Sequence, residues 1–67
     1  MADDITDLAE FELPYGRRAK LRRVDFDGGL SMVRLVLREG TRITQVDMDA
    51  ASASELGEAL IASARDL

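Results

Sequence analysis

The sequence predicts an α+β fold, a three-stranded antiparallel meander (β-β-β-α) with one C-terminal helix packed on one sheet face. Glycine-containing turns at 27–29 and 39–40 separate short segments rich in aliphatic residues, as in a series of hairpins. The last segment instead carries apolar residues at helical spacing. The chain has 67 residues, which allows one small domain with a marginal core. We expect strands at about 18–26, 30–38 and 41–48 and a helix at about 50–66.

Residues 1–14 are predicted to form an acidic arm that lies outside the domain of residues 15–67. The first twelve residues hold five carboxylates and no basic residue. We expect either a flexible segment or a short helix, because an isolated helix of this length is marginal in water. Pro14 ends any such helix, and Tyr15-Gly16 predicts a turn into the first strand.

The first strand does not alternate simply. Ala19 and Leu21 share one parity, whereas Val24 and Phe26 share the other. Because successive side chains point to opposite faces, two structures are open. Either a bulge near residues 22–23 brings the four side chains to one face, or the sheet has apolar residues on both faces.

The second strand alternates well, with aliphatic side chains at Val33, Leu35 and Leu37 on one predicted face. Its other face mixes Met32 and Val36 with arginines. The third strand is the shortest of the three and follows the turn at Gly40. We expect the aliphatic face of the second strand to lie under the helix.

The C-terminal helix has one continuous apolar stripe, formed by Ala53, Leu56, Gly57, Leu60, Ile61, Ala64 and Leu67. Two N-caps compete for its start, Asp49 or Ser52 with Glu55 as a capping box. Gly57 lowers helix propensity by about 1 kcal/mol relative to alanine. We expect this glycine to allow the helix to approach the sheet closely.

Charges are sorted along the chain. After the acidic arm, residues 15–24 hold five basic residues and no acid, although the net charge is −4. Three interpretations are open: the arm neutralises the basic strand, the basic residues dock a protein partner, or they bind nucleic acid. The overall acidity disfavours general nucleic-acid binding. The candidate partner or phosphate patch consists of Tyr15, Arg17, Arg18, Lys20, Arg22, Arg23, Arg34, Arg38 and Arg42.

One helix can cover only one face of a sheet, which leaves the other face to be covered differently. The residues left over would be Phe26, Met32, Val36 and Ile43. A second copy, the N-terminal arm or another protein could lie against them. We expect a homodimer, because two-fold pairs are the commonest assemblies and a chain this small has little stability to spare.

The composition excludes much of the chemistry that enzymes use. The chain has no Cys and no His, which removes thiolate zinc sites, Cys nucleophiles and the commonest general base. Asp25 with Asp27, and Asp47 with Asp49, could each present two oxygens to a cation, but turn-forming and helix-capping roles explain them better. We expect no catalysis, no cofactor and no metal.

The beginning of the sequence is acidic where a signal peptide would be basic, and no apolar run approaches the length of a membrane helix. We therefore expect a cytoplasmic protein.

Short words along the chain resemble a group of small uncharacterised proteobacterial proteins. They are Leu13-Pro14-Tyr15-Gly16-Arg17, Gly29-Leu30, Arg38-Glu39-Gly40-Thr41-Arg42 and Val46-Asp47-Met48-Asp49. The resemblance implies no activity, cofactor or catalytic residue, because that family has none assigned.

The function that these patterns favour is a small non-catalytic protein-interaction domain, homodimeric and with a basic strand that docks an acidic partner. The alternative is a weak single-stranded nucleic-acid binder that uses the same basic cluster.

Overall fold

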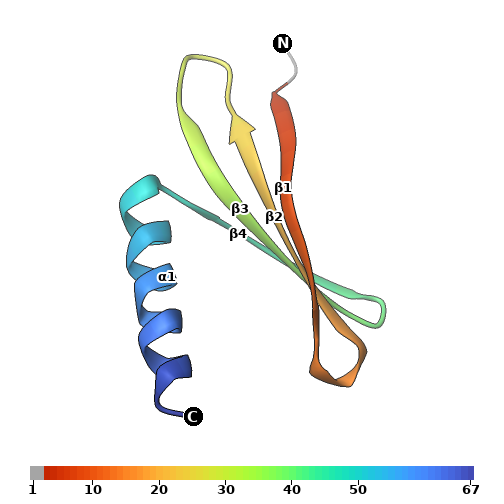
Figure 1. Ribbon diagram of the computed structural model, residues 1–67. Coiled ribbons are helices and arrows are strands. Elements are labelled where there is room, and N and C mark those ends of the chain that lie inside the picture. Colours follow the sequence, from red (N-terminus) through yellow and green to blue (C-terminus); the bar gives the residue numbers. More distant parts are fainter. Residues whose placement is uncertain (1–2) are drawn as a thin grey trace.

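The structure, a computed structural model, describes residues 3–67 and consists of one antiparallel sheet followed by one helix (Figure 1). The sheet has four strands in the order β1-β2-β3-β4. Their bounds are β1 Asp4–Leu13, β2 Arg17–Asp25, β3 Ser31–Glu39 and β4 Arg42–Met48, with a 3-10 turn at Pro14–Gly16 and helix α1 at Ala50–Arg65. The predicted α+β meander with a C-terminal helix is confirmed, but the predicted number of strands is wrong.

The additional strand is the acidic N-terminal segment. β1 pairs with β2 from Asp4 opposite Asp25 to Leu13 opposite Arg17. Tyr15 and Gly16 both have positive φ, 66° and 71°, which turns the chain sharply between the two strands. Residues 4–13 therefore form neither a flexible arm nor a short helix. Pairing with a basic strand provides hydrogen-bond partners for the backbone of this segment and places cations beside its carboxylates. An isolated helix of this length in water lacks such partners.

The predicted bulge in the first basic strand is also wrong. β2 pairs with β3 without a break from Arg18 opposite Arg38 to Asp25 opposite Ser31. The irregularity lies in β1, between Asp7 and Ala9. A bulge in the edge strand disrupts one ladder, whereas a bulge in β2 would disrupt two. The alternative prediction, apolar residues on both faces, is therefore the correct one.

Regular pairing gives the sheet two unlike faces, because side chains alternate along each strand. The first, called here the apolar face, is formed by Phe11, Leu13, Ala19, Leu21, Val33, Leu35, Leu37 and Met48. The second, called here the charged face, is formed by Asp7, Glu10, Glu12, Arg18, Lys20, Arg22, Arg34, Arg38 and Asp47. Among the described residues, the buried apolar side chains are Ala19 and Val24, one from each side of β2.

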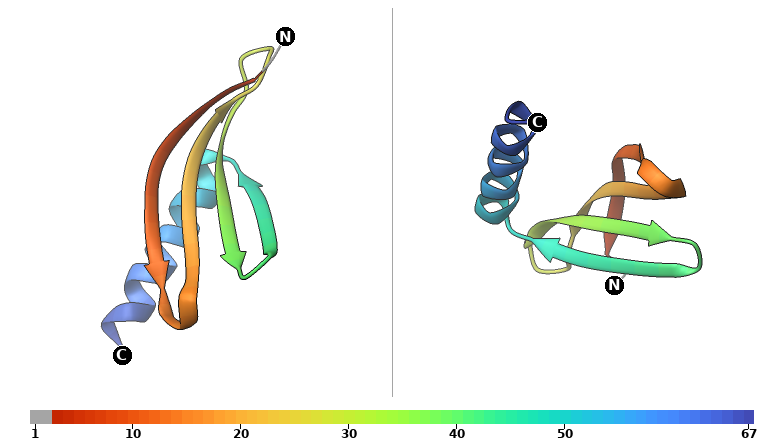
Figure 2. Two further views of the ribbon diagram at one scale, coloured as in Figure 1. Left: turned by 90° about the vertical axis from the view of Figure 1, so that its right-hand side faces the viewer. Right: turned by 90° about the horizontal axis from the view of Figure 1, so that it is seen from below.

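Helix α1 starts at the N-cap Asp49, whose carboxylate Oδ1 accepts a hydrogen bond of 2.7 Å from the backbone N–H of Ser52. This contact selects Asp49 over Ser52 as the cap. The helix then runs beside the sheet, on the side of the apolar face (Figures 1 and 2).

The predicted close packing of α1 on the sheet is wrong in this single chain. Leu56, Leu60 and Ile61 are 41%, 62% and 57% exposed. A Cβ added at Gly57 would meet no atom within 4 Å, so this glycine does not serve a close approach to the sheet. The helix borders the apolar face without covering it.

Candidate functional site

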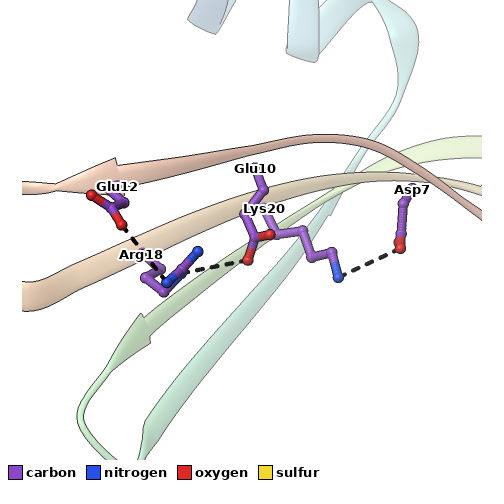
Figure 3. Close-up of polar contacts among 5 residues, drawn as sticks. All are labelled: Asp7, Glu10, Glu12, Arg18 and Lys20. Atoms are coloured by element: carbon purple, nitrogen blue, oxygen red, sulfur yellow. Dashed lines mark ion pairs between the residues drawn. The ribbon is translucent and has the colours of Figure 1, made fainter.

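Ion pairs link β1 with β2 on the charged face (Figure 3). Arg18 lies between two carboxylates, with Nε 3.5 Å from Glu10 Oε2 and Nη1 3.9 Å from Glu12 Oε1. Asp7 lies between two cations, with Oδ2 3.5 Å from Lys20 Nζ and Oδ1 2.9 Å from Arg22 Nε. The acidic segment thus neutralises the basic strand, which was the first of the three interpretations of the charge pattern.

A second set of contacts links β3 with β4 on the same face. Arg34 donates two hydrogen bonds to Asp47, from Nε to Oδ1 at 2.7 Å and from Nη2 to Oδ2 at 3.1 Å. This bidentate pair lowers the pKa of the Asp47 carboxyl and raises the pKa of the Arg34 guanidinium. The structure therefore holds both groups in their charged forms.

The aspartates considered as cation ligands have other partners. The hydroxyl of Ser31 donates to Asp25 at 2.5 Å and the Arg23 Nε donates to the same oxygen at 2.9 Å, and these contacts lower the pKa of Asp25. The hydrogen bond from the Ser52 N–H lowers the pKa of the N-cap Asp49. Within residues 3–67, no three carboxylates gather in a geometry that could hold a metal ion.

The candidate partner or phosphate patch is divided between the two sides of the sheet. Its members on the charged face are Arg18, Lys20, Arg22, Arg34 and Arg38. Its members on the other side are Arg17, Arg23 and Arg42, because their register positions match those of the aliphatic residues. Tyr15 lies at the β1–β2 turn, where its ring is stacked by the Arg17 guanidinium at 5.5 Å and is not part of either face. Among the described residues, Arg38 is the charged-face cation without an ion pair.

The candidate dimer face is not a continuous apolar surface. Met32, Val36 and Ile43 lie on the charged side of the sheet. Val36 lies opposite Lys20, and Ile43 lies opposite Arg38. Phe26 lies beyond the end of β2, in the loop before β3. The N-terminal segment does not cover these residues, because it extends the sheet sideways as β1.

A large apolar groove lies on the opposite side, between the apolar face and α1. This groove has a volume of about 510 Å³. Its lining contains no charged residue and consists of Phe11, Leu13, Ala19, Leu21, Val33, Leu35, Leu37, Met48, Ala53, Leu56, Gly57 and Leu60. Most of these residues were expected in a closed core, because the helix was predicted to cover the sheet. Phe11 and Leu13 were missed because their segment was not expected to be a strand.

Within the part of the chain that the structure describes, no helix combines the length and the apolar character needed to cross a membrane.

These features define a class of small domain in which a meander and one helix border an open apolar groove, while ion pairs link neighbouring strands on the other sheet face. The chain belongs to DUF6967, a family of unknown function whose family model matches residues 2–66. Comparisons with curated proteins and with solved structures gave no significant match. The resemblance to an uncharacterised family is thus confirmed.

Proposed function

We propose that this protein is a small non-catalytic interaction module that associates with itself through the apolar groove. The observation that carries the proposal is the contrast between the groove, lined by twelve residues without a charge, and the few side chains that the chain buries. Exposed apolar area favours association by roughly 25 cal/mol per Å² removed from water. A chain of this size gains little stability from its own core, so a covered groove would contribute a large share.

Self-association is favoured over binding of an unrelated protein because it needs only one kind of contact surface. A two-fold dimer covers the same surface on both chains with a single kind of contact.

The absence of Cys and His from the sequence supports a non-catalytic role, since a nucleophile or base active near neutral pH would have to come from other residue types.

The ion pairs of the charged face count against the nucleic-acid alternative. A phosphate backbone would have to displace Asp7, Glu10 and Glu12 from the cations that they contact. Fluorescence anisotropy with labelled single strands tests this alternative. Binding that weakens steeply between about 50 and 200 mM salt would support it, and we expect no binding at either salt concentration.

Light scattering across micromolar concentrations tests the proposed self-association. We expect a mass of twice 7.4 kDa. Two matched substitutions locate the contact surface: Leu60→Glu in the groove and Ile43→Glu on the charged face, at side chains that are 62% and 50% exposed. We expect Leu60→Glu to produce a monomer and Ile43→Glu to leave the dimer intact. A wild-type mass of 7.4 kDa at all concentrations would contradict the proposal.

A further inference from the structure

Helix α1 forms one wall of the groove, and its apolar stripe is largely exposed. Leu56 and Leu60 line the groove, yet they are 41% and 62% exposed. Ile61 belongs to the same stripe, is 57% exposed and lies outside the groove lining. The apolar stripe is therefore wider than the surface that the chain's own sheet offers to it, and a second contact surface is needed to cover it.

The exposed area of the chain is large enough to form a stable dimer interface. The surface of 5444 Å² exceeds by about 1,200 Å² the roughly 4,200 Å² typical of a folded chain of 7.4 kDa. The radius of gyration, 13.5 Å, is likewise larger than the roughly 11 Å typical of 67 residues. If two copies removed this excess from water, they would bury about 2,400 Å² together, which lies in the range of obligate homodimers.

Gly57 points to a helix as the occupant of the groove. This residue lines the groove, and a Cβ at its position would meet no atom within 4 Å. Glycine weakens a helix, so its place on the apolar stripe has no benefit within the single chain. Ala53 lies one turn earlier on the same side and also lines the groove. Together these two small residues leave room for another backbone to pass close to α1.

We propose that α1 of a second copy enters the groove beside the chain's own α1, and that the two chains insert their helices reciprocally in this way about a two-fold axis. The groove has no charged lining and is bordered along one side by a helix, so it suits an elongated apolar occupant. Among the described residues, those of helix α1 form an apolar stripe that remains exposed in the single chain. In the resulting dimer, the two helices lie side by side between the two apolar faces. This inference rests on the proposed self-association and names the segment that performs it.

Isotope-filtered NMR on a mixture of labelled and unlabelled chains tests the reciprocal helix insertion without any substitution. We expect inter-chain contacts between the methyl groups of Leu56 and Leu60 and those of Val33, Leu35 and Leu37 in the groove. The reciprocal helix insertion would be overturned by a dimer in which these contacts occur only within one chain. It would also be overturned if inter-chain contacts involved only Met32, Val36 and Ile43. The former result would leave the proposed self-association intact. A monomer at all concentrations would overturn both.

Gly57→Ala gives a second test in a variant that does not lose helix propensity. If another helix passes close to Gly57, the added methyl group raises the dimer dissociation constant about tenfold, as expected for overpacking. Glu55→Ala is the matched control, because it also places alanine on α1 and lies outside the groove lining. We expect Glu55→Ala to change the dissociation constant less than twofold. An unchanged or lower dissociation constant for Gly57→Ala would contradict the close passage.

Discussion

The two faces of this sheet satisfy their side chains in different ways. On the charged face, each ion pair joins two residues on neighbouring strands, so a single layer is sufficient to bring the partners together. On the apolar face, Leu35 and its neighbours line a groove that remains open. Charges can be neutralised within the plane of a sheet, whereas apolar area is removed from water only by a second layer. The side chains of the charged face thus find partners within the single chain, and the proposed self-association concerns the apolar face.

Strand β3 contains both situations in adjacent residues. Leu35 lies on the apolar face opposite Leu21 and Val46, and Val36 lies on the charged face opposite Lys20 and Gln45. Both side chains are half-buried in the single chain. Substitutions at these two positions can therefore separate the contributions of the two faces.

The largest effect is expected for Leu35→Ala. If a second copy covers the groove, the substitution lowers the free energy of unfolding by about 2–5 kcal/mol, as for other leucines in cores. Val36→Ala should cost less than about 1.5 kcal/mol, because its side chain remains partly in contact with water. Urea unfolding at protein concentrations well above dimer dissociation measures both values. Equal losses at the two positions would remove the distinction between the faces.

A smaller effect is expected for Asp7→Asn, which removes the carboxylate that lies between Lys20 and Arg22. The two pairs are solvent-accessible, so the free energy of unfolding should fall by about 0.5–1 kcal/mol at low salt. The loss should become smaller at high salt, because mobile ions screen exposed charges.

Glu58→Gln on α1 is the control for that measurement, since this carboxylate is exposed and lies far from β1 in sequence. We expect it to leave the stability nearly unchanged at both salt concentrations. If Asp7→Asn behaves like this control, the ion pairs of the charged face contribute nothing measurable to stability.

The smallest effect is expected for the melting temperature when the pH is lowered. Hydrogen bonding to Arg34 lowers the pKa of Asp47, and hydrogen bonding to Ser31 and Arg23 lowers the pKa of Asp25. A carboxyl with a lowered pKa in the folded state stabilises the fold above its unfolded pKa of about 3.9, and this contribution is lost as the pH falls through the folded pKa. The melting temperature should therefore change little between pH 7 and about pH 5 and fall below about pH 4.

Asp47→Asn sharpens this pH experiment, because the amide cannot take up the proton that breaks the contact with Arg34. We expect its melting temperature to be lower than that of the wild type at neutral pH and to decline less on acidification. Circular dichroism from neutral to acidic pH measures both curves. Parallel curves for the two proteins would show that the Arg34–Asp47 pair does not contribute to the acid dependence.

Local features of the fold were predictable because neighbouring residues encode them. Gly28, Gly29 and Gly40 have positive φ and form the two predicted turns. β3 and α1 follow their apolar spacing to within a residue or two of the predicted bounds, and Asp49 was one of the two predicted caps. The opposite charge blocks also predicted the neutralisation of the basic strand, since complementary charges attract wherever the chain brings them together.

What the sequence by itself determined, then, is which segments can be strands, turns and a helix, and which side of each is apolar, because these properties depend on residues a few positions apart. Only the tertiary structure decided that residues 4–13 join the sheet, that the bulge lies at the edge in β1, and that α1 borders the apolar face without covering it. These outcomes depend on contacts between residues distant in sequence, whose free energies compete with one another only when the whole chain is assembled.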